Sequence, residues 1–130
     1  MMRSLIIFLV PLAMIGCGQS TPLATHGKPV SHWVEVLRGP DAKARKKAVI
    51  ALGHVGTADP AVMPALIGAL KDRDATVRAE AVLALLNLGP AAKDAIPALE
   101  EATKDKDAKV RGYAVKALER IRRQTNAPSE

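Results

Sequence analysis

The sequence predicts an all-α protein made of stacked copies of one helical pair. Two observations lead to this fold class. Of the 130 residues, 48% are hydrophobic but only 2% are aromatic, so alanine, leucine and valine supply most of the apolar surface. Sheet proteins draw more heavily on aromatic and β-branched residues, which favours helices here. The second observation is an internal repeat, which predicts that the helices come in similar units.

The repeat has a period of 33 residues. Residues 74–89 read DATVRAEAVLALLNLG, and similar stretches start at Asp41 and Asp107, with no gap needed to align the three copies. Six columns are identical in all copies: Asp41, Asp74 and Asp107; Arg45, Arg78 and Arg111; Ala48, Ala81 and Ala114; Val49, Val82 and Val115; Ala51, Ala84 and Ala117; Leu52, Leu85 and Leu118. Such a pattern predicts three structural units of one design.

Each unit is expected to contain a short helix, a turn and a longer helix. The short helices are expected at residues 31–37, 64–70 and 97–103, and each longer helix begins directly after an aspartate of the first column. An aspartate there is a favourable N-cap, because its carboxylate accepts a backbone N–H and meets the positive end of the helix. Gly56 and Gly89 stand where C-cap glycines are found.

The apolar residues of the long helices fall on one helix face. In the middle copy, positions 78, 81, 82, 85 and 88 have the spacing of a single face. One helical pair cannot bury such a stripe alone, whereas stacked copies can, and three units are the usual minimum for a stable stack. We expect Trp33 to cover the first unit and the polar last helix to cap the other end.

The pattern D-x-x-V-R-x-x-A-V-x-A-L, at residues 74–85 and 107–118, resembles the HEAT repeats, in particular the short HEAT-like kind first associated with phycobilisome lyases. The resemblance implies a right-handed α-solenoid of three HEAT-like helical hairpins. It also implies a ladder of charged side chains, in which each arginine of the repeated arginine column pairs with an aspartate. Carried over to this chain, the ladder consists of Asp41, Arg45, Asp74, Arg78, Asp107 and Arg111.

The first residues predict export and lipidation. Arg3 precedes an apolar run at residues 5–15, which has the layout of a secretory signal and is too short to span a bilayer comfortably. The ending MIGC resembles the lipobox of bacterial lipoproteins, which implies lipid attachment at Cys17. We therefore expect a signal peptide at 1–16, a flexible tether at 17–29, the repeat domain at 30–123 and a disordered tail at 124–130. Gly18, rather than aspartate, follows the cysteine, and resemblance to the sorting rule of enteric bacteria then implies the outer membrane, where the organism has one.

No motif predicts catalysis, a metal or a cofactor. His26, His32 and His54 lack the short helical spacing that two metal ligands on one helix require, and no His-Glu dipeptide is present. The adjacent carboxylates Glu100 and Glu101 point about 100° apart on a helix, so they cannot share a substrate. The sequence therefore favours a binding protein over an enzyme.

The columns that differ between copies predict a binding face, because repeat proteins keep their cores and vary their contact surfaces. Apolar residues from each copy could form a strip flanked by basic side chains, or they could simply complete the core. The candidate face consists of Lys46, Lys47, Ile50, His54, Glu80, Leu83, Asn87, Tyr113, Lys116 and Arg120.

The leading hypothesis is a monomeric, non-enzymatic scaffold or adaptor in the bacterial cell envelope that binds an acidic or peptide-like protein. Without residues 1–16 the chain remains basic, but an exported protein meets anionic lipids and wall polymers rather than nucleic acid. Two alternatives stay open at this point. One is a lyase-like accessory protein, and the other is a module that binds a polyanion such as a cell-wall polymer or lipid headgroups.

Overall fold

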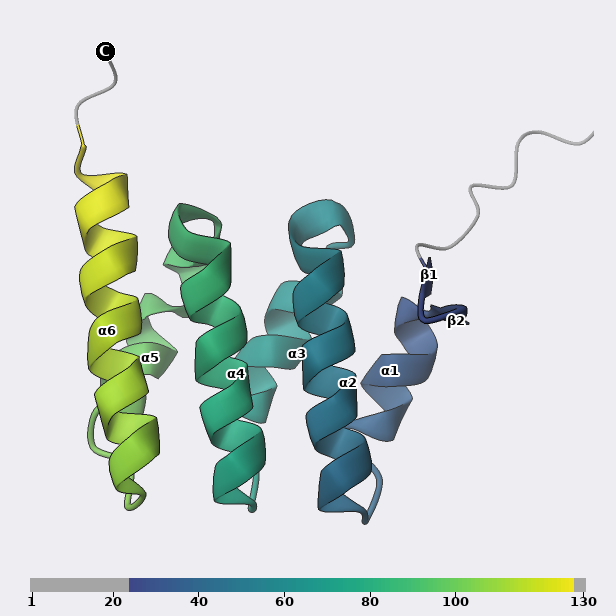
Figure 1. The fold of residues 1–130 in the computed structure, drawn as a ribbon. Coiled ribbons are helices and arrows are strands. Elements are labelled where there is room, and N and C mark those ends of the chain that lie inside the picture. Colours follow the sequence, from purple (N-terminus) through teal and green to yellow (C-terminus); the bar gives the residue numbers. More distant parts are fainter. Residues whose placement is uncertain (1–23, 128–130) are drawn as a thin grey trace, which may run out of the picture.

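The structure is a computed structural model that describes residues 24–127, and within them six α-helices form three consecutive pairs (Figure 1). The predicted signal peptide at residues 1–16 and the predicted lipidation site Cys17 lie outside the described residues. The elements are β1 (Ala24–Thr25), β2 (Lys28–Pro29), α1 (Val30–Val36), α2 (Ala42–Val55), η1 (Gly56–Ala58), α3 (Val62–Ala69), α4 (Ala75–Leu88), η2 (Gly89–Ala95), α5 (Ile96–Ala102) and α6 (Ala108–Thr125).

The helices form two layers. The long helices α2, α4 and α6 stand side by side in the front layer of Figure 1, and the shorter helices α3 and α5 lie behind them. The chain runs along each long helix, crosses to a short helix in the second layer and returns to the next long helix. Successive pairs therefore advance as a right-handed superhelix, which confirms the predicted solenoid.

One continuous core runs between the layers and through all three pairs. The repeated alanine and leucine columns are buried in each long helix, as Ala48 and Leu52 show in α2, both 0% exposed. Small residues bring the front helices together: a Cβ built on Gly53 of α2 would lie 3.1 Å from Cβ of Ala84 in α4. Burying a leucine side chain contributes about 2 kcal/mol, so the repeated columns account for much of the stability of the stack.

The predicted N-caps are present in all three long helices. Asp41 accepts a hydrogen bond from the backbone N–H of Lys43 at 3.1 Å. Asp74 accepts from the N–H groups of Thr76 and Val77, and Asp107 does the same for the equivalent residues of α6. The three helices thus start at the residues that the aspartate column predicts.

The expected tether is partly folded. Its last residues form the hairpin β1–β2, which turns at His26 (φ 53°) and Gly27 (φ 71°). Trp33 of α1, 5% exposed, donates a hydrogen bond from Nε1 to the backbone oxygen of Thr25 at 3.2 Å. The tryptophan therefore closes the first unit as expected, and it does so together with the hairpin. At the other end, α6 runs to Thr125 and so includes the first two residues of the predicted tail.

By length and composition alone, the stretch Ala75–Ala102 is apolar enough to count as a candidate membrane span. It is not one straight helix, because it joins α4, η2 and α5, and Ala92 inside η2 has non-helical backbone angles. Its apolar residues Leu85 and Leu99 are 0% exposed in the core of the stack. Its hydrophobicity is explained by burial between neighbouring units.

Replacing Gly56 with alanine should lower the free energy of unfolding by about 1–3 kcal/mol, because Gly56 ends α2 at φ 61° and ψ −137°, a region that side chains strongly disfavour. The added Cβ would also lie 3.1 Å from Cδ2 of Leu88. Gly68→Ala is the matched control. Gly68 is exposed within α3 with open space around its Cα, so alanine should be neutral or stabilising. Urea denaturation measures both variants, and equal effects would contradict this explanation.

Candidate protein-binding face

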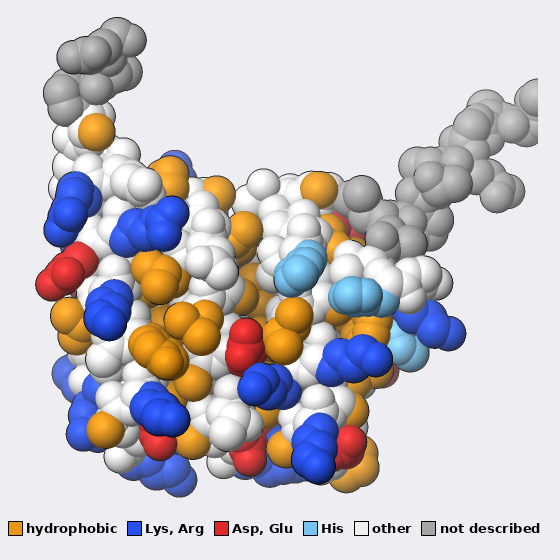
Figure 2. Space-filling view, viewed as in Figure 1, with side chains coloured by type: hydrophobic (Ala, Val, Ile, Leu, Met, Phe, Trp, Pro, Cys, Tyr) orange, Lys and Arg blue, Asp and Glu red, His pale blue; other side chains and the backbone are white. Residues whose placement is uncertain are grey.

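The predicted face residues lie on one surface of the molecule, formed by the front layer of α2, α4 and α6. Figure 2 shows this surface, with hydrophobic side chains gathered over α4 and α6 and basic side chains distributed around them. The surface is hollowed in several places, and each hollow lies between neighbouring long helices. We call it the front face.

One hollow of the front face lies between α4 and α6 and has a volume of about 520 Å³; we call it the main hollow. Leu83 and Tyr113 provide apolar and aromatic surface in it, while Glu80, Lys46 and Lys109 add charge at its edges. A smaller hollow of about 80 Å³ lies between α2 and α4 and is lined by Ile50, His54, Glu80 and Asn87. A third hollow, of about 320 Å³, contains Lys116 and Arg120.

Burial distinguishes the two interpretations of the apolar strip. Ile50 and Leu83 are partly exposed and belong neither to the buried core nor to the apolar residues packed directly against it. Tyr113 is also partly exposed, but its ring packs against the core. Two of the three apolar side chains are therefore surface residues rather than core residues.

The charges of the front face are unevenly distributed. Lys46 Nζ lies 3.8 Å from Oε2 of Glu80, so these two charges partly neutralise one another. Lys47 lies over the Trp33 ring, with Nζ 6.0 Å from the ring centroid, a cation–π distance that places it away from the main hollow. Within the described residues, Lys109, Lys116 and Arg120 of α6 have no carboxylate partner at ion-pair distance.

The structure adds Lys109 to the predicted set. Lys109 lines the main hollow beside Tyr113, because positions 109, 113, 116 and 120 share one side of α6. That helical spacing was visible in the sequence. The repeat comparison did not single out Lys109, because its column, which consists of Lys43, Thr76 and Lys109, has the same residue in two of the three copies.

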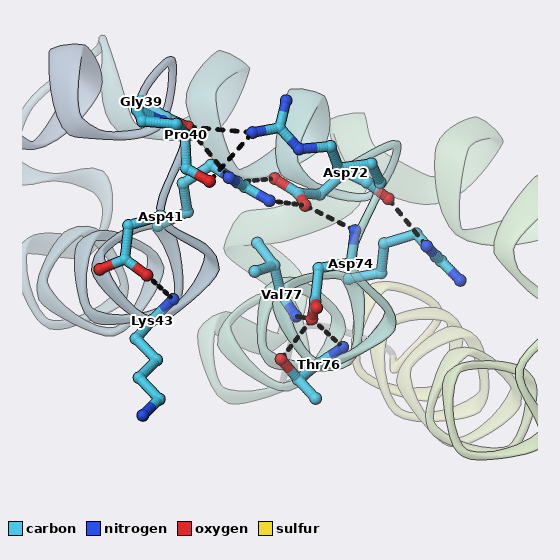
Figure 3. A network of polar contacts seen from close by, with 11 residues as sticks. Gly39, Pro40, Asp41, Lys43, Asp72, Asp74, Thr76 and Val77 are labelled. Atoms are coloured by element: carbon cyan, nitrogen blue, oxygen red, sulfur yellow. Dashed lines mark hydrogen bonds and ion pairs between the residues drawn. The ribbon is translucent and has the colours of Figure 1, made fainter.

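The arginine ladder exists, but its partners differ from the expected ones. Arg45 donates from Nε and Nη2 to both carboxylate oxygens of Asp72, at 2.8 and 3.0 Å, rather than to Asp41 (Figure 3). Arg78 binds Asp105 in the same way, at the same distances. The expected partners one turn away cannot serve, because the aspartates before the helices are occupied as N-caps. Each ion pair therefore joins a long helix to the turn of the following unit, 27 residues on.

Both arginines also donate to a backbone carbonyl in the turn of their own unit. Arg45 Nη1 lies 2.9 Å from the Gly39 oxygen, and Arg78 Nη1 lies 2.8 Å from the Asp72 oxygen. Arg45 is 2% exposed and Arg78 is 5% exposed. These guanidinium groups are therefore held in structural contacts.

The ladder also shifts the pKa of its groups. The hydrogen bonds with Asp72 raise the pKa of Arg45, and those with Asp105 raise the pKa of Arg78. Burial alone would raise the pKa of Asp105, but hydrogen bonds from Arg78 and from the Asp107 backbone outweigh it and lower the pKa. A lowered carboxyl pKa stabilises the folded state above its ordinary value of about 4, and this contribution is lost as the pH falls through the lowered pKa.

Two of the three histidines lie beside Trp33 at the first unit. The ring centroids of His26 and His32 are 6.3 and 5.0 Å from that of Trp33, and the ring centroid of His54 is 6.3 Å from that of His26. In the part of the chain that the structure describes, no group of three or more histidine, cysteine or acidic residues could hold a metal ion. These contacts are therefore between aromatic rings.

Stacked helical pairs joined by an arginine–aspartate ladder define an α-solenoid repeat protein. The chain belongs to the HEAT repeat family, whose model, described as HEAT repeats, matches residues 30–119. This family is generally associated with protein interaction and is typically non-catalytic. The match supports the family and not the narrower lyase type.

The structure is similar to the crystal structure of an engineered protein from the Northeast Structural Genomics Consortium, with 27% sequence identity and a TM-score of 0.59. The match covers 72% of this chain and 45% of the engineered one, so this chain spans less than half of that structure. The comparison with curated proteins gave no match.

The ladder predicts that replacing two arginines of the same column will change the free energy of unfolding by different amounts. Arg78→Ala should lower the free energy of unfolding by about 3 kcal/mol, because it leaves the largely buried carboxylate of Asp105, 12% exposed, without its partner. Arg111→Ala should change it by less than about 1 kcal/mol, because Arg111 is exposed and binds only backbone oxygens. Chemical denaturation of both variants at neutral pH checks the difference. Similar losses would show that the pairing with Asp105 is unimportant.

Proposed function

We propose that this protein is a non-enzymatic scaffold or adaptor that binds a protein partner on its front face. The observation that carries the proposal is the main hollow between α4 and α6. It combines the partly exposed side chain of Leu83, which is not part of the hydrophobic core, with the amphipathic ring of Tyr113. Tyrosine and exposed apolar groups surrounded by charge are typical of protein interfaces.

The charges around the hollow indicate the kind of partner. Lys109, Lys116 and Arg120 follow α6 along one side and have no carboxylate partner among residues 24–127. A protein segment with one apolar side chain for the hollow and acidic groups for α6 would complement this surface. A helix or an extended peptide can present such a pattern.

Leu83→Asp should abolish the interaction, because it places a negative charge in the apolar part of the hollow. The measurement is crosslinked affinity capture from the native envelope, comparing the wild type with Leu83→Asp. Ala61→Asp is the matched control, because it adds the same charge at an exposed position before α3, in the other layer. We expect Ala61→Asp to capture the same proteins as the wild type and Leu83→Asp to capture none of them. If both variants capture the same proteins, the front face is not the binding surface.

The row of basic residues on α6 also supports a second candidate, a module that binds a polyanion. Exposed charges are screened within about 8 Å at physiological ionic strength, so such binding should weaken steeply with added salt. In that case Lys116→Glu with Arg120→Glu would abolish binding to anionic vesicles or wall polymer, and Leu83→Asp would have little effect. Binding that survives salt and depends on Leu83 supports the protein partner.

We also propose that the protein is exported and anchored to a bacterial membrane through lipid on Cys17. The support is the sequence of residues 1–17, which lie outside the described structure. Cys17→Ser should release the protein from the membrane fraction or leave it unprocessed, which fractionation and mass spectrometry of the mature protein detect. A Cys17→Ser protein that is membrane-bound and the same size as the wild type would contradict lipidation.

A further inference from the structure

The last helix presents a surface that the earlier units use internally. In α4 the side facing the following unit carries Arg78, Ala79 and Val82. The equivalent residues of α6 point away from α4, because the same helical positions face the next place in the stack. We call this surface the end face, and it consists of Arg111, Gly112 and Val115.

The end face keeps the character of an internal contact. Val115 is 44% exposed, although its equivalents Val49 and Val82 are both 0% exposed, and it is the exposed large hydrophobic residue of the described chain. Gly112 lies in the middle of α6, and a Cβ there would meet nothing within 4 Å. Glycine destabilises a helix by about 1 kcal/mol relative to alanine. Because a Cβ at this position would have free space, no close contact within the described residues requires glycine here.

Arg111 is the third arginine of the ladder and lacks the carboxylate that the other two bind. Its Nη1 donates to the backbone oxygens of Asp105 and Lys106 at 2.7 and 3.1 Å, in the manner of the equivalent contacts of Arg45 and Arg78. Within residues 24–127, its Nε and Nη2 have no acceptor. These are the two donors that Arg45 and Arg78 direct at an aspartate of the following unit.

We propose that the end face binds a helical pair of a partner protein, one that carries a carboxylate in the turn between its helices. The carboxylate would accept the two free donors of Arg111, as Asp105 does for Arg78, and a small or apolar side chain would cover Val115 beside Gly112. The contact extends over the first half of α6. Further along, Glu119 and the ion pair between Arg122 and Glu100 make the surface polar.

A second copy of this chain does not fit the same place. Gly39 stands 33 residues before Asp72, in the column that would have to supply the aspartate. The first unit is also covered by the hairpin β1–β2 and by Trp33. The partner is therefore a different helical-repeat surface, and this proposal does not depend on the front face.

The test is site-specific photo-crosslinking of the full chain in its native cells, with a benzophenone amino acid at position 115. The expected product joins position 115 to a helix-turn segment of another protein that contains an aspartate or glutamate. Arg111→Asp should reduce the crosslink about tenfold or more, because it replaces attraction by repulsion. Gly112→Leu should reduce it similarly by bulk alone, while leucine favours the helix.

Lys71→Asp is the matched control, since it makes the same charge change at an exposed position in the turn after α3, outside both proposed faces, and should leave the crosslink unchanged. Circular dichroism checks that each variant is folded. The decisive support is rescue, in which replacing the crosslinked acid by arginine restores the product with Arg111→Asp. A crosslink to lipid or to a second copy, a crosslink insensitive to Arg111→Asp, a failed rescue or no crosslink would each overturn the proposal. Loss of the front-face interaction through Leu83→Asp should leave this crosslink intact.

Discussion

A guanidinium group buried between two helical pairs is favourable only when a carboxylate of the following pair meets it. Arg45 and Arg78 satisfy this condition through two-point contacts with Asp72 and Asp105. The alanine, valine and leucine columns are so alike that sliding one pair along another would still bury apolar surface. Sliding would, however, separate each arginine from its aspartate and leave a buried charge unpaired. The ladder therefore fixes the register in which the units stack.

The fold was predictable from the sequence because its determinants are local and repeated. An aspartate before a helix and a glycine after it act within one turn of backbone, so Asp74 and Gly89 mark the ends of α4. The ladder partners were not predictable from helical spacing alone, because Arg45 and Asp72 are 27 residues apart and meet only after stacking. The aspartates at 72 and 105 do repeat at the period of 33, and that was the available signal.

The candidate site was predictable in part for the same reason. Comparing copies identifies which columns vary, and Leu83 and Tyr113 do lie together in the main hollow. It does not show that Lys47 turns towards Trp33, since that contact depends on where α1 packs. The hairpin was missed as well, because two strands of two residues each carry no periodic pattern.

Two kinds of surface follow from one repeated design. Positions that differ between copies gather on the front face, where each unit contributes a different side chain to one continuous surface. The identical arginine and valine columns face the following unit, and their residues become exposed in α6, where the described stack ends. The same arginine and valine are therefore core residues in α4 and surface residues in α6, which composition alone does not reveal.

Gly39 makes the two ends of this stack different, because the first unit lacks the aspartate side chain found at the same place in the next two units. A solenoid whose two ends complement one another joins head to tail without closing, and such contacts lead to open-ended fibres. At the start of this chain Gly39 occupies the column of Asp72 and Asp105 and has no side chain, and its backbone oxygen already accepts from Arg45 and Arg73. That one substitution removes the matching half of the contact. A protein built from self-stacking units thereby avoids polymerising through the contact that holds its own units together.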